Sequence, residues 1–258
     1  MEQYSKLAKC YDKLNADFDY KGLASFLASE IKENENVNTS LVLDLACGTG
    51  KLTFLLRELG YDMTGVDLSE EMLMVARDIS FKKGIDNILW LNQDMTDFEL
   101  YGTVDACVCT LDSLNYLTSI KDLEKCLSLV KNYLIPDGVF VFDLNTPYRF
   151  EKVYSDNSFV LEDDDTFLVW QNQYSKRSKI CDFYLSIFER LPNGTYERQD
   201  EMQRERCYSM KQIKSLLDKF GFEIIHVYGD FDKSPVCDES EKWYFTVRNK
   251  KENLCQQF

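Results

Sequence analysis

The sequence predicts an α/β protein with a largely parallel sheet, and three observations lead to that prediction. Short apolar runs of strand length alternate with longer segments of helical period, which is typical of a parallel sheet covered by helices. A glycine-rich turn follows the first apolar run. Two strand-like runs near the C-terminus are joined by a polar linker and can pair antiparallel. We therefore expect seven strands, five of them parallel and two in a C-terminal antiparallel hairpin.

Each expected element has its own sequence signal. The five parallel strands are apolar runs at residues 40–45, 62–67, 88–92, 104–110 and 138–143. The helices between them are expected at residues 50–59, 70–83 and 120–133. Ser69 and Thr118 are typical N-cap residues, and Gly60 and Gly84 are typical of helix C-terminal ends.

Segments outside this alternation predict two additions to the sheet. Residues 4–32 have apolar positions at helical spacing and are expected to form an N-terminal helical lid. Residues 159–208 are aromatic-rich and strand-like, with a turn signal at residues 192–194, and predict an inserted antiparallel β layer. A helix at 209–220 and two strands, 222–229 and 242–248, follow.

The composition is that of one folded protein and argues against two classes of partner. A chain of 258 residues with 45% hydrophobic residues can bury one large core. Thirty Lys and Arg against 44 Asp and Glu give a formal charge of −14, which repels phosphate backbones, so no nucleic acid partner is expected. No run has the roughly 20 apolar residues of a membrane helix, and no signal peptide pattern is present, so no membrane association is expected.

The cysteines and the histidine bear on compartment and metal binding. The chain has 9 cysteines, and Cys107 and Cys109 lie in an apolar run, which indicates reduced thiols and a cytoplasmic protein. The single histidine, His226, lies in an apolar stretch and is expected to be a structural strand residue. No metal site is therefore predicted.

The strongest functional signal is LVLDLACGTG, where an apolar strand ends in Asp44 and a glycine-rich turn opens a helix. Gly48 and Gly50 let the backbone approach a ligand, and open α/β sheets bind ligands at the carboxyl ends of their strands. A dinucleotide motif would need a third glycine at Thr53, and the spacing of a Walker sequence is missing. The carboxylate of Asp44 would repel pyrophosphate and attract a cation, so a nucleotide-like cofactor with a positive charge is expected.

This turn resembles the first motif of the class I S-adenosylmethionine-dependent methyltransferases, D-x-A/G-x-G-x-G. Asp44, Ala46, Gly48 and Gly50 stand at its fixed positions. The resemblance implies a Rossmann-like sheet and S-adenosyl-L-methionine as the cofactor, with the turn, including Cys47, around its methionine part.

Two further strand ends match that family in order. Asp67 ends the second expected strand, where the family has an acidic residue that binds the ribose hydroxyls. Leu68 and Met72 would then pack on the adenine. After the third strand, Asp94 would face the adenine amino group, and the backbone of Met95 would line the ring. Each aspartate also has an explanation that needs no ligand. Asp67 could stabilise the N-terminus of the next helix by its charge, and Asp94 is of a type that commonly ends strands.

The segment from Thr110 to Leu117 resembles the family segment that runs beneath the methionine tail toward the acceptor. The resemblance implies that Thr110 contacts the cofactor and that Asp112 or Tyr116 orients the acceptor or acts as the catalytic base. In the family an N-terminal tyrosine covers the methionine end of the cofactor, and Tyr11 is expected there. The alternative for Tyr11 is a ring that only anchors the lid to the core.

Both ends of the chain, YSKLAKCYDKL and GDFDKSPVCDESEKWYFTVRNK, look like a bacterial branch of YqeM-like small-molecule methyltransferases. The expected inserted layer resembles the acceptor-side cover of glycine and sarcosine N-methyltransferases and of amino-sugar N,N-dimethyltransferases. The resemblance implies a cofactor-binding domain at residues 1–147 and 209–258 and an acceptor-covering subdomain at 148–208. The acceptor would be an amine or hydroxyl of a small molecule, and the protein a monomer or homodimer.

Two alternatives to this function remain open at this point. A sensor or regulatory subunit that binds S-adenosylmethionine or S-adenosylhomocysteine without catalysis would have the same cofactor motifs. A nicotinamide-dependent oxidoreductase is less consistent with the sequence, because Thr53 stands where its motif has glycine.

Overall fold

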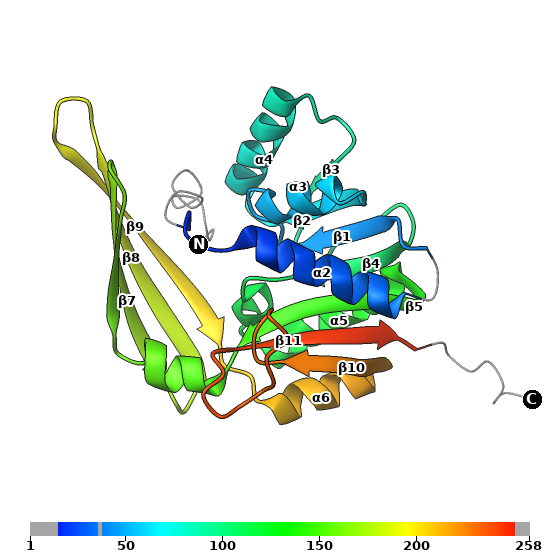
Figure 1. The fold of residues 1–258 in the computed structure, drawn as a ribbon. Helices are drawn as coiled ribbons and strands as arrows, with labels where there is room; N and C mark the ends of the chain where they lie inside the picture. The colour runs from blue at the N-terminus through cyan, green and yellow to red at the C-terminus, as the bar shows by residue number, and fades with distance from the viewer. Residues whose placement is uncertain (1–14, 36–37, 251–258) are drawn as a thin grey trace, which may run out of the picture.

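The computed structural model describes residues 15–35 and 38–250 of the 258-residue chain. Within them the chain forms a seven-stranded sheet and a separate four-stranded sheet (Figure 1). The helical elements are α2 (Tyr20–Asn34), α3 (Lys51–Glu58), α4 (Glu70–Lys83), the 3₁₀ helix η1 (Ser113–Tyr116), α5 (Ile120–Tyr133), the π-helix η2 (Arg149–Tyr154) and α6 (Met210–Lys219). The strands are β1 (Leu41–Leu45), β2 (Asp62–Asp67), β3 (Leu89–Asn92), β4 (Val104–Cys109), β5 (Leu134–Asn145), β6 (Ser158–Glu162), β7 (Thr166–Ser175), β8 (Ile180–Arg190), β9 (Tyr196–Arg206), β10 (Phe222–Tyr228) and β11 (Lys242–Asn249).

The seven-stranded sheet confirms the predicted fold. Its order is β10-β11-β5-β4-β1-β2-β3, and β1 to β5 are mutually parallel. Strand β11 pairs antiparallel with both β5 and β10. Strand β5 begins earlier than expected, because Leu134 already pairs with Val104 ahead of a register shift. The chain winds outward in both directions from β1, and such sheets bind ligands where β1 and its neighbour β4 end.

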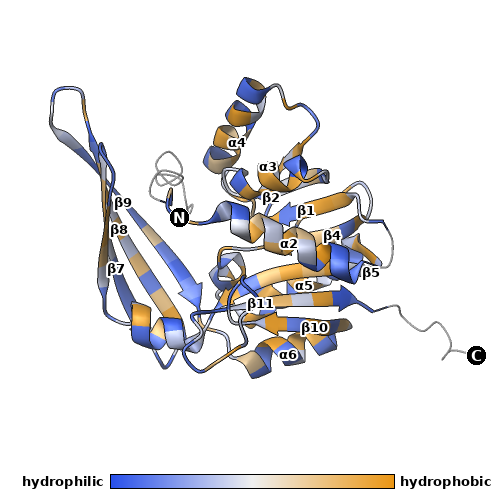
Figure 2. Ribbon diagram, in the orientation of Figure 1, coloured by the Kyte–Doolittle hydropathy of each residue, from blue (hydrophilic) through white to orange (hydrophobic). Residues whose placement is uncertain are grey.

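Helices cover both faces of this sheet. Helices α2 and α3 pack on one face, in a buried cluster that includes Leu27 and Val141. Helices α5 and α6 pack on the other face, in a cluster that includes Leu127 and Phe140. Successive residues of β5 therefore reach opposite buried faces, as expected for a strand covered on both sides. Figure 2 shows β4 and β5 in hydrophobic colours for most of their length.

The four-stranded sheet, β6-β7-β8-β9, confirms the predicted inserted layer; we call residues 158–206 the insert. The predicted turn at residues 192–194 joins β8 to β9. The insert has its own small core, in which Tyr154 of η2 packs edge-on against Phe183 of β8. In Figure 1 it stands on the side where the parallel strands of the main sheet end.

The helix ends agree with the expectation except in α5. Ser69 caps α4 with its hydroxyl oxygen, and Gly84 ends that helix in the left-handed conformation at φ 65°. The prediction of Thr118 as an N-cap is wrong. Ser119 caps α5 instead, because its Oγ accepts a hydrogen bond from the N–H of Asp122.

The predicted N-terminal lid is described only in part. Residues 4–14, including Tyr11, lie outside the described residues. Helix α2 begins at Tyr20 and packs on the main sheet. Its buried Glu30 has Oε2 2.9 Å from Nδ1 of His226 in β10, which agrees with the structural role expected for the histidine. Of the helices that the structure describes, none is long and apolar enough to cross a membrane.

Candidate functional site

A cavity of about 370 Å³ lies at the carboxyl ends of β1, β2, β3 and β4. Its volume is within the range of small-molecule sites, roughly 300–1,000 Å³. The predicted site residues that line it are Asp44, Ala46, Cys47, Gly48, Asp67, Leu68, Met72, Asp94, Met95, Thr110 and Tyr116. The fold thus brings together residues that follow four different strands.

The glycine-rich turn after β1 leaves one side of the cavity open to a ligand. Ala46, Gly48 and Gly50 all have positive φ, at 62°, 56° and 76°. A Cβ added to Gly48 would meet no atom of the described residues within 4 Å, and Gly48 lines the cavity. The missing side chain therefore leaves room for a ligand to approach the backbone, as the sequence predicts.

Gly50, which the sequence also predicts to let the backbone approach the ligand, is not among the described residues that line the cavity. A Cβ at this position would lie 2.4 Å from Cη2 of Trp90 and 3.3 Å from Cβ of Ala76. The indole of Trp90 occupies the space beside the turn, so packing within the protein requires glycine here.

Asp44 is a buried carboxyl at the end of β1. It is 3% exposed, and its Oδ2 accepts a 2.5 Å hydrogen bond from Oγ1 of Thr53. Burial raises the pKa of Asp44 to about 7, the charge of Asp67 adds to the rise, and the hydrogen bond from Thr53 opposes it. Such a carboxyl changes its charge near neutral pH, and a cationic ligand beside it would favour the ionised form.

Both carboxylate oxygens of Asp67 are anchored at the end of β2. Oδ2 accepts the N–H of Gly48 at 2.7 Å, and Oδ1 accepts the N–H of Ser69 at 2.8 Å. Burial raises the pKa of Asp67, and these backbone hydrogen bonds oppose the rise. Each oxygen has a second lone pair, so the fixed carboxylate can still accept hydrogen bonds from two hydroxyl groups.

The side of the cavity next to β3 combines a carboxylate with apolar surface. Oδ1 of Asp94 accepts the N–H of Thr96 at 2.7 Å, which fixes this side chain. Leu68, Met72 and Met95 supply apolar surface to the same cavity. This combination suits a flat aromatic base that carries an amino group.

The cavity is acidic, with one basic side chain in its wall. Lining residues that the sequence did not single out for ligand binding include Tyr20, Thr49, Lys51, Gln93, Thr96 and Asp122. Lys51 is the only Lys or Arg among the described lining residues, against four aspartates, and its Nζ lies 4.1 Å from the ring centroid of Tyr20. The position of Lys51 directly after the glycine-rich turn was a signal for this role. Tyr20 is the first residue of α2, which precedes the first strand, so no motif of the sequence connects it with the cavity.

The segment after β4 forms the opposite wall and connects the cavity to the insert. Thr110, Ser113 and Tyr116 line the cavity. Tyr116 Oη donates a 2.9 Å hydrogen bond to Oε1 of Gln203 in β9. The two sheets therefore meet at this wall.

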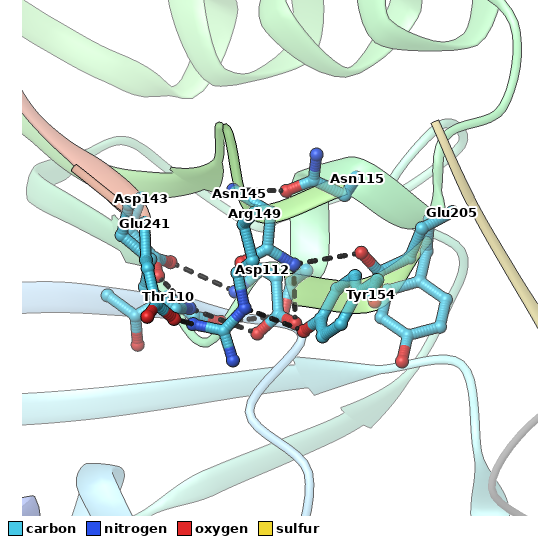
Figure 3. A network of polar contacts seen from close by, with 12 residues as sticks. Thr110, Asp112, Asn115, Asp143, Asn145, Arg149, Tyr154, Glu205 and Glu241 are labelled. Carbon is cyan, nitrogen blue, oxygen red and sulfur yellow. Dashed lines mark hydrogen bonds and ion pairs between the residues drawn. The ribbon is translucent and has the colours of Figure 1, made fainter. Parts of the chain in front are cut away.

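Asp112 belongs to the same segment, but among the described residues it does not line the cavity, contrary to the expectation. Its carboxylate accepts a hydrogen bond from Lys242 Nζ at 3.2 Å. It also accepts one from Asn145 Nδ2 at 3.0 Å (Figure 3). Burial by itself would raise the pKa of Asp112, but the charges of Lys242 and Arg149 and the hydrogen bond from Asn145 hold it below its usual value. A carboxylate stabilised in this way is a poor proton acceptor.

Asn145, at the end of β5, links Asp112 to the insert. Its Nδ2 also donates a 2.9 Å hydrogen bond to Oε2 of Glu205 in β9. Burial and the charge of Asp112 raise the pKa of Glu205 well above its usual value, so this carboxyl tends to keep its proton. One amide group thus bridges two buried carboxyl groups whose pKa values are shifted in opposite directions.

Comparisons with known proteins agree with this geometry. A family model described as a methyltransferase domain matches residues 42–138. The protein YqeM of Bacillus subtilis (strain 168), which bears the name of a methyltransferase, is 31% identical over 96% of this chain and 98% of its own. The crystal structure of a S-adenosylmethionine-dependent methyltransferase from Clostridium acetobutylicum ATCC 824 matches with a TM-score of 0.86 and 33% identity, over 96% of this chain and 99% of that one. A glycine/sarcosine N-methyltransferase of Halorhodospira halochloris is 26% identical over 93% of this chain and 85% of that protein.

Proposed function

This chain belongs to the class I S-adenosylmethionine-dependent methyltransferases, in the YqeM branch, and we propose that it methylates an amine or hydroxyl group of a small molecule. The observation that carries the proposal is the acidic cavity at the strand ends, whose wall continues through Tyr116 onto β9 of the insert. We further propose that residues 148–208 form the subdomain that covers the acceptor.

The groups around the cavity fit the cofactor. The anchored carboxylate of Asp67 suits a pair of ribose hydroxyls, and Asp94 suits an adenine amino group. Asp44 offers negative charge to a cation, Gly48 leaves space beside the backbone, and Lys51 suits a carboxylate. When bound, S-adenosylmethionine supplies a methyl group already activated by a positively charged sulfur, so the chain needs chiefly to position the acceptor and exclude water.

We assign Tyr116 to the acceptor side of the site. Tyr116 lines the cavity, and its hydroxyl group donates a hydrogen bond to Gln203 of the insert, so the ring lies where the cofactor site meets the strands that we assign to the acceptor. From there its side chain would orient the acceptor. Asp112, whose carboxylate is held by Lys242 and Asn145, would act through the position of this segment and not as the base.

A small acceptor is supported by the relatives and by the charge of the chain. The Halorhodospira relative is named for glycine and sarcosine, and the match covers 93% of this chain, so it includes most of the insert. The formal charge of −14 disfavours a nucleic acid acceptor.

The experiment is a metabolite extract incubated with the protein and S-adenosylmethionine that carries an isotope-labelled methyl group, followed by mass spectrometry. We expect the label in one or a few amines or alcohols. Asp67→Ala is the matched control, and it should leave those compounds unlabelled.

Two outcomes would contradict the proposal. Transfer of the label to RNA or protein instead would exclude a small acceptor. Tight binding of S-adenosylhomocysteine with no labelled product from several extracts would favour the sensor.

A further inference from the structure

Two consecutive residues of the segment between β4 and η1 have a strained backbone. Leu111 and Asp112, between β4 and η1, have φ of 57° and 61°, in the left-handed region that residues with a Cβ rarely adopt. Leu111 lines the cavity, as do Thr110 and Ser113, the residues on either side of this pair. The turn can keep this conformation only if surrounding groups hold it there.

Charged groups from β5 and β11 supply that restraint. The N–H of Asp112 donates a 3.1 Å hydrogen bond to Oδ1 of Asp143, which is fully buried in β5. Lys242, the first residue of β11, places its Nζ 3.2 Å from Oδ1 of Asp112 and 2.5 Å from Oδ2 of Asp143. The ammonium group thus contacts both the carboxylate of Asp143, which accepts the N–H of Asp112, and the carboxylate of Asp112 itself.

The geometry points to Lys242 as a positioning residue for cofactor binding: by bridging Asp112 and Asp143, it holds the 110–116 wall in the shape that faces the cofactor. Lys242 itself is not among the described residues that line the cavity. Its side chain is 13% exposed, so its charge is directed inward to these two carboxylates. No other Lys or Arg of the described residues forms an ion pair with either of them.

The test measures the affinity for S-adenosylhomocysteine by isothermal titration calorimetry, well below the unfolding midpoint of each variant. The change is Lys242→Met, which keeps the length of the side chain and removes the charge. The matched control is Lys219→Met, whose ion pair with Glu124 lies on the surface, with the lysine 56% exposed. The wild-type protein is the reference. If it does not bind S-adenosylhomocysteine, the assignment of the cofactor site is wrong, whatever the role of Lys242.

We expect Lys242→Met to weaken binding by about tenfold or more, and Lys219→Met to change it by less than about twofold. Hydrogen exchange of the backbone amides at residues 110–118 should become faster in Lys242→Met. A residue that only stabilises the fold would lower the unfolding midpoint without changing the affinity of the folded molecules.

Lys242→Met leaves the buried carboxylates of Asp112 and Asp143 without their ion-pair partner, and this variant could fail to fold for that reason. A second variant covers that case. Lys242→Met combined with Asp112→Asn removes one of those charges and still lacks the bridge. Weak binding by this folded double variant supports the inference. Binding within about twofold of the wild type, by either folded Lys242 variant, overturns it.

Discussion

Asp44 combines burial with a pKa of about 7, and this predicts a pH dependence of cofactor binding. The carboxyl is mostly protonated below pH 7 and mostly ionised above it, and the positively charged cofactor favours the ionised form. We therefore expect the affinity for S-adenosylmethionine to rise by roughly tenfold between pH 6 and pH 8. Calorimetric titrations across this range measure it.

The control for that prediction is Asp44→Asn, which keeps the hydrogen-bonding shape and removes the titration. Its affinity should be lower than that of the wild type at pH 8 and nearly independent of pH. A wild-type affinity that falls as the pH rises would show that Asp44 is not the group that meets the positive charge.

The two glycines of the turn should respond differently to alanine. Gly50→Ala should cost the strain of positive φ, about 1–2 kcal/mol of folding free energy, and about 1–3 kcal/mol more because its Cβ would lie 2.4 Å from the indole of Trp90. The Cβ of Gly48→Ala would meet no atom within 4 Å in the part of the chain that the structure describes, so this variant should cost only the strain of positive φ, about 1–2 kcal/mol.

The same two variants should separate in ligand binding, because the Cβ of Gly48→Ala would enter the cavity. Urea unfolding gives the stabilities, and calorimetry with S-adenosylhomocysteine gives the affinities. A larger affinity loss in Gly50→Ala than in Gly48→Ala would contradict the assignment of these positions.

At the scale of elements, η1 is joined to two other elements by one side chain. Asn115 is fully buried; its Oδ1 accepts the N–H of Asn145 at 2.9 Å, and its Nδ2 donates to the carbonyl oxygen of Arg206 at 2.9 Å. Asn115→Ala leaves one buried and one part-buried backbone group without this partner, so the free energy of unfolding should fall by about 2 kcal/mol. Urea unfolding measures it, and Ser25→Ala, which removes an exposed hydrogen bond on α2, should be nearly neutral.

The elements that the sequence predicts well are those with local signals. Strands β1 and β2, the turn between β1 and α3, and the cap at Ser69 depend on residues close together in the chain, and the structure has them where expected. Thr118 and Ser119 are both good N-caps, so the sequence alone did not decide between them. The π-helix η2 had no periodic signal that would distinguish it from a loop.

The parts of the site that were not predicted depend on contacts between distant segments. Lys242 reaches Asp112 across 130 positions of sequence, and Asn145 reaches Glu205 across 60. No spacing rule connects such residues before the sheet order is known. Asp112 was therefore expected at the cavity from its place after β4, whereas its carboxylate is directed to β11 and β5.

At the scale of the whole molecule, negative charge should distinguish the two forms of the cofactor. The chain has a formal charge of −14, and the described part of the cavity wall has four aspartates and one lysine. S-adenosylmethionine has one more positive charge than S-adenosylhomocysteine, so salt should weaken its binding more. We expect a several-fold loss for S-adenosylmethionine between about 20 and 300 mM NaCl and little change for S-adenosylhomocysteine. Equal losses for both in parallel titrations would show that the field of the protein has no part in the discrimination.

Trp90 gives the molecule a built-in fluorophore beside the cofactor turn. It pairs with Gly65 of β2, its ring lies where a Cβ of Gly50 would be, and its Nε1 donates a hydrogen bond to Oγ of Ser80. A ligand that moves the turn must change the surroundings of this ring, so the emission spectrum of unlabelled protein should follow occupancy in real time. Trp90→Phe would remove that optical signal and leave the emission of the remaining tryptophans as the background.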